Sequence, residues 1–168
     1  MQPIPPPVNP ALRIREITED DAAAWLPLWD GYNAFYGRTG ETALSTGITE
    51  ATWRRFLNPV EPVFALVAER QGRIEGLAHY LFHLSTTRIE PVCYLQDLFT
   101  RPQCRGQGVG RALIETVYGQ ARAAGATRVY WHTQVDNHAG RALYDKVAAH
   151  LGFIVYTHDQ ADRLGDTP

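Results

Sequence analysis

The feature that most constrains the fold is a strand-like run followed by a glycine-rich turn and a helix-like run. The apolar run from Tyr94 to Thr100 is followed by Arg105-Gly106-Gln107-Gly108-Val109-Gly110-Arg111, and apolar residues then recur every fourth position from Val109 to Ala124. That spacing marks one buried helix face, and Gly125 ends the helix. Because a crossover helix joins parallel strands, we expect the strand before it and a strand from Arg128 to Val135 to be parallel.

Other periodic runs place further strands and helices around this unit. Alternating or β-rich runs predict strands at Ala11–Ile17, Val63–Glu69, Arg73–His83, Val92–Thr100 and Gly152–Tyr156. Helical spacing and capping residues predict helices from Thr18 to Tyr36, from Thr49 to Leu57 and from Asn137 to about His150. Strands grouped in the middle of the chain with helices around them predict an α/β fold with a mixed sheet.

Length and charge limit the number of domains and the classes of partner. A chain of 168 residues with 45% hydrophobic content is long enough for one packed domain and short for two. We expect that domain over residues 11–158, between a flexible proline-rich head (1–10) and a flexible tail (159–168). A net charge of −2 gives no positive field to attract nucleic acid or an anionic membrane. No apolar run approaches the ~20 residues that cross a bilayer.

Cysteine usage bears on location and on the kind of site. Cys93 and Cys104 are the two cysteines, and no signal-peptide pattern precedes them. We therefore expect free thiols in a cytoplasmic protein. We expect no metal site.

The segment from Arg105 to Arg111 is suited to binding phosphate oxygens. Glycine brings the backbone close to a ligand, so that successive N–H groups can point at an anion on a helix N-terminus. The spacing G-x-G-x-G differs from the G-x-G-x-x-G of dinucleotide folds, and the Gly-Lys-Ser/Thr of a P-loop is missing. A glycine-rich turn without a ligand is the alternative.

Two motifs in this order resemble one family, the GCN5-related N-acetyltransferases (GNAT). The first is Arg105-x-x-Gly108-x-Gly110 after a strand, with Pro102 between. The second is Asn137 followed by Ala142-Leu143-Tyr144 and Leu151-Gly152-Phe153. The resemblance extends from Val63 to Tyr156 and is greatest to the histone/polyamine and diamine acetyltransferase branch. It implies a GNAT fold: a mixed sheet of six to seven strands flanked by four helices and splayed between the fourth and fifth strands.

The resemblance also implies a binding site for acetyl-CoA. Backbone groups near Leu98, Phe99 and Thr100 would pair with the pantetheine arm and the acetyl carbonyl, as an added strand pairs with a sheet edge. Arg101 would reach the 3′-phosphate or remain an ordinary solvated side chain. The further implied cofactor-binding residues are Arg105, Gly106, Gln107, Gly108, Val109, Gly110, Arg111, Asn137 and Tyr144.

Tyr144 and Asp97 are the catalytic candidates. A tyrosine, with a pKa near ~10, is protonated at neutral pH and can donate to a leaving thiolate as a general acid; the alternative is a packed aromatic residue beside Leu143. The diamine-acetyltransferase pattern has a glutamate directly before the strand's aspartate, where this chain has Gln96. Asp97 is then a base, an anchor for the substrate ammonium, or a residue bonded to backbone. His132 is a second proton acceptor or a structural histidine.

An aromatic segment with one acid is the expected pocket for the amine, together with Gln96, Asp97 and His132. Aromatic faces and carboxylates attract a cationic amine, and the segment offers Trp29, Asp30, Tyr32 and Tyr36. The alternative is that its aromatic residues are only the buried stripe of a helix.

The expected activity is acetyl transfer from acetyl-CoA to a primary amine by direct attack. Neither cysteine has a histidine partner in the sequence, so a covalent acetyl-enzyme is not expected. The expected substrate is a small amine, either a polyamine or an amino-acid-like compound. The alternatives are a protein lysine or N-terminal amine, and a non-catalytic module that senses acyl-CoA. The resemblance further suggests a homodimer.

Overall fold

The computed structural model describes residues 11–158, so the expected head (1–10) and tail (159–168) lie outside the described residues. The chain divides into two compact units, one up to Gln134 and the other from Val135. The strands of the first unit are β1 (Arg13–Glu16), β2 (Val63–Arg70), β3 (Arg73–His83), β4 (Val92–Thr100) and β5 (Arg128–Tyr130). Its helices are α1 (Ala22–Phe35), α2 (Thr46–Leu57) and α3 (Val109–Ala123), with short 3-10 turns η1 (Glu19–Asp21), η2 (Gly40–Thr42) and η3 (Pro102–Cys104). The second unit contains α4 (His138–Tyr144).

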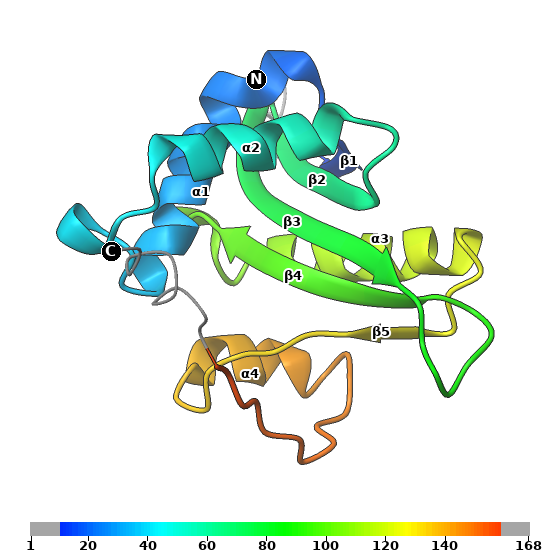
Figure 1. Cartoon of the computed structure of the whole chain (residues 1–168). Helices are drawn as coiled ribbons and strands as arrows, with labels where there is room; N and C mark the ends of the chain where they lie inside the picture. Colours follow the sequence, from blue (N-terminus) through cyan, green and yellow to red (C-terminus); the bar gives the residue numbers. More distant parts are fainter. Residues whose placement is uncertain (1–10, 159–168) are drawn as a thin grey trace, which may run out of the picture. The chain divides into compact units, whose positions relative to one another are not determined.

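The sheet has the order β1-β2-β3-β4-β5 (Figure 1). The first four strands pair antiparallel, and β4 and β5 pair parallel, as the crossover through α3 predicts. The α/β class expected from the sequence is confirmed. Among the described residues, none of the helices has the length and apolar character needed to span a membrane.

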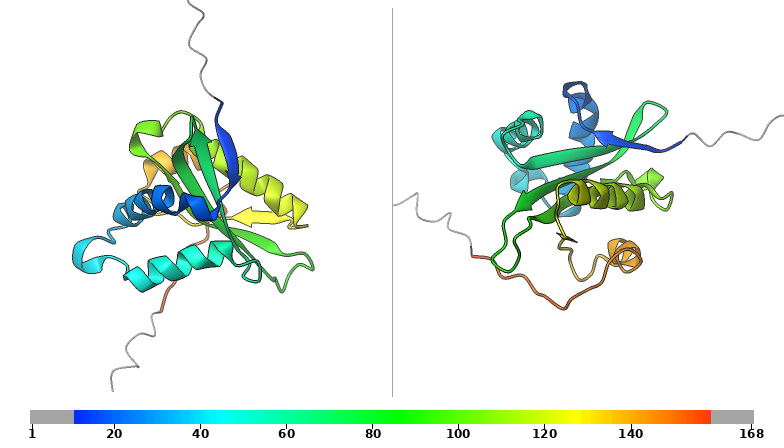
Figure 2. Two further views of the ribbon diagram at one scale, coloured as in Figure 1. Left: turned by 90° about the horizontal axis from the view of Figure 1, so that it is seen from above. Right: turned by 90° about the vertical axis from the view of Figure 1, so that its right-hand side faces the viewer.

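The helices cover both faces of the sheet (Figure 2). Side chains of α1 pack with Ala65, Val67, Leu77 and Phe99 on one face, and Trp53 and Phe56 of α2 pack against the same cluster. On the other face, α3 approaches β3 where Gly76 has no side chain, beside Val109 and Leu113. The apolar positions of α3 at every fourth residue are all buried, as its periodicity predicts.

Three expected element boundaries are wrong. The described residues form five strands rather than six to seven, because Gly152–Tyr156 forms no strand. In addition, β5 ends at Tyr130 instead of Val135. A strand needs a pairing partner as well as β-forming residues, and the segment 151–158 is exposed along its whole length. Helix α4 ends at Tyr144 rather than near His150 because the following N–H groups of Lys146 and Val147 bond three residues back, which tightens the turn.

The expected splay lies between β4 and β5. The pairing covers only Val92–Tyr94 against Arg128–Tyr130, whereas β4 continues to Thr100. From Leu95 onward, the edge of β4 that faces away from β3 therefore has no strand partner among the described residues.

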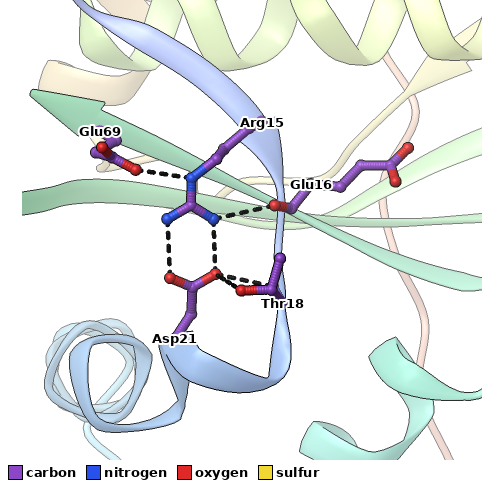
Figure 3. A network of polar contacts seen from close by, with 5 residues as sticks. All are labelled: Arg15, Glu16, Thr18, Asp21 and Glu69. Atoms are coloured by element: carbon purple, nitrogen blue, oxygen red, sulfur yellow. Dashed lines mark hydrogen bonds and ion pairs between the residues drawn. The ribbon is translucent and has the colours of Figure 1, made fainter. Parts of the chain in front are cut away.

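An ion-pair network fixes the entry into α1 (Figure 3). The Arg15 guanidinium donates two hydrogen bonds to the two carboxylate oxygens of Asp21, at 2.6 and 2.8 Å, and its Nε donates to Glu69 at 2.7 Å. The backbone N–H of Thr18 also donates to Asp21. The hydrogen bond from Arg15 lowers the pKa of Asp21 from 3.8 to about 2. The network joins β1, β2 and the first turn before α1.

Candidate functional site

A bulge in β4 determines where its acidic side chain points. His79 of β3 pairs with Asp97 while the next residue, Tyr80, pairs with Leu95, so Gln96 is the extra residue. Because side chains alternate along each strand, the bulge places Asp97 and Tyr94 on the same face of the sheet, the face covered by α1. Gln96 itself is exposed.

Asp97 belongs to a buried chain of hydrogen bonds. Nδ1 of His79 lies 2.9 Å from Oδ2 of Asp97, and the Trp25 indole N–H donates to Nε2 of His79 at 3.0 Å. A nitrogen that accepts from an indole carries no proton, so His79 is neutral and donates through Nδ1–H to Asp97. His79 is 1% and Asp97 8% exposed. The carboxylate therefore lies in the interior with neutral donors.

His79 is the site residue that the sequence did not single out. It lies 18 residues before Asp97 and 54 after Trp25, so no local motif joins the three. The available signal was a lone polar residue in the apolar run Leu77-Ala78-His79-Tyr80. A polar side chain in a buried strand needs a hydrogen-bond partner. That requirement could have marked His79 as a residue of interest.

Tyr32 of α1 and Tyr36, the residue that follows α1, adjoin Asp97. Burial, followed by the charge of Asp97 and a hydrogen bond to it, raises the pKa of Tyr32 well above its usual range. Burial and the charge of Asp97 also raise the pKa of Tyr36, whose hydroxyl bonds to Thr133. The rings lie 5.1 Å apart between centroids. Both hydroxyls stay protonated at neutral pH and act as donors.

A second aromatic group lies at the β4–β5 pairing. The rings of Tyr94 and Tyr130 are 5.0 Å apart, and the Tyr94 hydroxyl is 3.2 Å from Nδ1 of His132. His83 of β3 bonds to the Tyr130 hydroxyl through Nε2 at 3.0 Å. Burial raises the pKa of Tyr94, and the charge of Asp97 contributes to the same shift. His132, expected near the substrate, is exposed and bonded to Tyr94 within this group.

The remaining expected amine-pocket residues of α1 differ in exposure. Trp29 is 6% exposed, stacks between Trp25 and Tyr32, and donates its indole N–H to Thr49. It is therefore a core residue, and the alternative of a buried helix stripe holds for it. Asp30 is exposed and lines a hollow of about 240 Å³ between α1, η2 and α2, together with Asn33 and Arg38.

The glycine loop leaves its backbone accessible. Gly106 and Gly108 have φ of 74° and 84°, in the left-handed region that favours glycine, and a Cβ at either would meet nothing within 4 Å. Gly108 is the N-cap of α3, and the first intrahelical bond is Ala112 N–H to its carbonyl at 2.9 Å. The N–H groups of the residues between them have no intrahelical acceptor. An anion fits this helix start.

The side chains of the loop are mostly engaged. Gln107 accepts from Arg70 of β2 at 3.2 Å and donates to the Gln103 carbonyl, and Val109 is buried. Arg105 lies 5.9 Å over the Phe99 ring and donates to the Thr100 carbonyl, and Arg101 donates to the Ile74 carbonyl. Exposed parts of Arg105 and Arg111 can still contribute positive charge, since Arg111 has only a long 3.5 Å contact to Glu115.

The second unit contains the two remaining expected residues on one short helix. Asn137 is the N-cap of α4 and accepts from the Gly140 N–H at 3.1 Å. Tyr144 is the last residue of α4, two turns later, so both lie on one face of it. The capping predicted for Asn137 is confirmed.

Comparison with known proteins shows to which family this chain belongs. The sequence matches the acetyltransferase (GNAT) family over residues 22–149, a range that includes both units. The chain belongs to the GNAT family. It is 35% identical over 151 residues to the D-amino-acid N-acetyltransferase HPA3 of Saccharomyces cerevisiae, covering 89% of this chain and 91% of that protein.

Two further proteins extend the comparison. The chain is 28% identical to the aminoglycoside N(6′)-acetyltransferase type 1 of Stenotrophomonas maltophilia, over 78% of this chain and 81% of that protein. The fold resembles that of AAC(6′)-Iy in complex with a CoA bisubstrate analogue, with a TM-score of 0.75 at 16% identity, covering 89% of this chain and 99% of that one. The GNAT chain described here is thus an acetyl-CoA-dependent N-acetyltransferase that transfers acetyl groups to an amine.

The residues present fit acetyl-CoA. Left-handed glycines with open space beside them allow phosphate oxygens to approach the backbone at the start of α3. The unpaired edge of β4 from Leu95 to Thr100 offers backbone groups to an extended chain such as pantetheine. Loop and edge are consecutive in the sequence, joined by η3.

Proposed function

We propose that this GNAT enzyme acetylates the primary amino group of a small, amino-acid-like molecule by direct attack. The observation that carries the proposal is a buried carboxylate, Asp97, whose hydrogen-bond partner His79 and neighbour Tyr32 are both neutral. A buried charge is stable when it is paired, and a substrate ammonium is the complementary partner. The resemblance to a D-amino-acid N-acetyltransferase supports the amino-acid-like class over the polyamine class.

We propose cofactor contacts from two backbone segments and the helix of the second unit. Leu98, Phe99 and Thr100 would pair with the pantetheine arm through backbone groups. The segment from Arg105 to Arg111 would bind the pyrophosphate. Gln107 and Val109 would act through their backbone N–H groups, because the Gln107 side chain is hydrogen-bonded and the Val109 side chain is buried. The glycines Gly106, Gly108 and Gly110 would also act through backbone N–H groups. Asn137 and Tyr144 of the second unit are the further cofactor-binding residues that we propose from the family resemblance.

The proposed chemistry needs a proton acceptor and a proton donor. Acetyl-CoA supplies a thioester carbonyl and a thiolate leaving group. An alkylamine with a pKa near ~10.4 is almost wholly protonated at neutral pH and cannot attack until a proton leaves it. Asp97 would accept that proton at its carboxylate, since Gln96 in the family's glutamate position cannot. Tyr144 would supply a proton from its hydroxyl as general acid.

The amine-binding face would combine Asp97 with the hydroxyls of Tyr32 and Tyr36. Gln96, exposed at the bulge, and His132, bonded to Tyr94, would lie at the edge of this face. Asp30 would contact the substrate from the hollow beside α1. Trp29 would act indirectly, by supporting Tyr32 through ring stacking at 5.6 Å.

Thiol release from acetyl-CoA tests this function. We would measure release across amino acids, polyamines, aminoglycosides and a lysine-containing peptide, for the wild type and for Tyr144→Phe. The proposal expects release with amino acids and a fall in kcat of about 100-fold or more in the variant, since general acids contribute roughly 10²–10⁴-fold. Tight acetyl-CoA binding without release for any amine would instead indicate a sensor, and preference for the peptide a protein acetyltransferase.

We further propose that the protein acts in the cytoplasm as a homodimer. Leu26 and Phe35 of α1 are 43% and 47% exposed, which leaves apolar surface for a second copy. Light scattering at micromolar concentration should give twice the mass of the chain. A monomer mass across that range would contradict the homodimer.

A further inference from the structure

Arg38 follows α1 and is held in a fixed position. Its Nε donates to Oδ1 of Asn33 at 2.7 Å, and Asn33 is buried and donates through Nδ2 to the Trp29 carbonyl at 2.9 Å. The guanidinium carbon lies 5.6 Å from the ring centroid of Tyr32 and 5.3 Å from that of Tyr36. Stacking and a buried amide thus orient the planar group.

The guanidinium still has donors to offer. An arginine carries five N–H donors, and the four on Nη1 and Nη2 of Arg38 bond to no acceptor within the described range 11–158. No carboxylate of that range lies within ion-pair distance of Arg38. The fork that binds carboxylates in pairs is therefore available to a ligand.

Arg38 and Asp97 are opposite charges that act on the same two tyrosines. The charge of Asp97 contributes to the raised pKa of Tyr32, and the Tyr32 ring lies under the Arg38 guanidinium. The charge of Asp97 raises, and that of Arg38 lowers, the pKa of both Tyr32 and Tyr36. An anion whose hydrogen-bond partner, His79, is neutral and a cation without an ion-pair partner in residues 11–158 thus both act on the tyrosine pair.

We propose that Arg38 binds the carboxylate of an amino acid whose amino group lies at Asp97. An α-amino acid carries an ammonium and a carboxylate one carbon apart, which complements an anion and a cation that act on the same two tyrosines. A polyamine would instead bring a second cation toward Arg38 and be repelled. The hollow of about 240 Å³, lined by Arg38, Asp30, Leu44 and Thr49, receives the substrate side chain.

This inference rests on the proposed function, and paired substrates test it separately. The substrates are the amino acid that the wild type acetylates best, the amide of that amino acid, and the amine without its carboxyl group. The wild type should prefer the free acid by about 10-fold or more in kcat/KM. Arg38→Gln should raise KM for the acid about 10- to 100-fold, because the variant loses a pair of charge-assisted hydrogen bonds to the carboxylate.

The amide and the decarboxylated amine distinguish recognition from folding. Their kcat/KM should change less than about threefold in Arg38→Gln, and Arg38→Lys should recover part of the affinity for the acid. Arg54→Gln, which removes an exposed arginine from α2, is the matched control and should leave all three substrates unchanged. Equal losses for acid and amide would overturn the carboxylate site.

If Arg38→Gln fails to fold, the substrate preference of the wild type alone still tests the carboxylate site. Acetylation of amines without preference for the free acid would refute the carboxylate site and leave the proposed function standing. Acetylation of no amine at all would refute both.

Discussion

At the scale of single residues, the site depends on how His79 holds Asp97. The Trp25 indole fixes the tautomer of His79 through Nε2, so that Nδ1–H faces the carboxylate. Only Oδ2 of Asp97 is engaged by His79. A neutral donor positions the acid without cancelling its charge.

Replacement of His79 by leucine should therefore reduce turnover more than cofactor binding. Asp97 would be left buried without its donor, at a cost of about 1–3 kcal/mol, and we expect kcat/KM for the amine to fall by about 10- to 100-fold. His83→Leu, which removes an exposed histidine from the same strand, is the control. Steady-state kinetics and acetyl-CoA calorimetry provide the measurement, and unchanged kcat/KM in His79→Leu would exclude the positioning role.

At the scale of elements, α1 approaches β4 through a glycine. A Cβ on Gly31 would lie 2.7 Å from Cζ of the Phe99 ring, so the absent side chain lets the helix pack on the strand beside Asp97. The same close packing brings Tyr32, the next residue, toward the carboxylate.

Gly31→Ala should be destabilising although alanine favours helices. Overpacking costs about 1–3 kcal/mol, which exceeds the ~1 kcal/mol gained in helix propensity. Gly119 of α3 is a matched control because a Cβ there meets nothing within 4 Å, and Gly119→Ala should gain roughly 0.5–1 kcal/mol. Urea unfolding measures both, and equal stabilisation by the two substitutions would show that the helix can shift away from Phe99.

The turn before α1 should show a pH-dependent contribution. The pKa of Asp21 is lowered from 3.8 to about 2, chiefly by Arg15, so the folded state favours the carboxylate. This contribution, about 2 kcal/mol at 1.36 kcal/mol per pKa unit, is present above pH 3.8 and is lost as the pH falls toward 2.

Asp21→Asn should consequently be less stable than the wild type by about 2 kcal/mol at pH 7, and the difference should narrow below pH 4. Asp20→Asn, a neighbouring exposed acid, should show no such narrowing. Urea titrations between pH 7 and pH 2.5 give the comparison. A constant difference across that interval would mean that Arg15 does not depress the pKa.

At the scale of the whole molecule, the glycine loop is connected to the sheet. Arg70 at the end of β2 donates to Gln107 of the loop and lies 3.4 Å from Glu75 of β3. If the cofactor binds at the loop as proposed, its binding is coupled to the folded sheet, and a bound ligand should stabilise the chain.

Acetyl-CoA at 100 times its Kd should stabilise the folded state by about 2.7 kcal/mol, which corresponds to a Tm increase of roughly 5 to 10 °C. Gly108→Glu should abolish the increase, by bulk and by charge against phosphate. Gly125→Glu is the control, since Gly125 follows the other end of α3 with φ of 75° and equally open space. Thermal melts with and without acetyl-CoA measure this, and a retained shift in Gly108→Glu would place the phosphates elsewhere.

Local patterns in the sequence determined the order of elements, the parallel pair across α3 and the glycine loop before α3. Each depends on residues close together in the chain, such as the four-residue period of α3 and the spacing of Gly106 and Gly108. The same patterns mark the family, which the comparisons confirm. Periodicity and glycine conformation are properties of short segments, so they can be predicted without knowing the tertiary contacts.

Tertiary structure alone decided which side chains meet. The bulge at Gln96 turns Asp97 toward His79, and Trp25 reaches His79 from 54 residues away. Asn33 and the two tyrosine rings orient Arg38 beside them, and the strand expected at Gly152–Tyr156 does not form. These features depend on pairing between distant segments, and pairing is determined by packing and register, which no local period encodes.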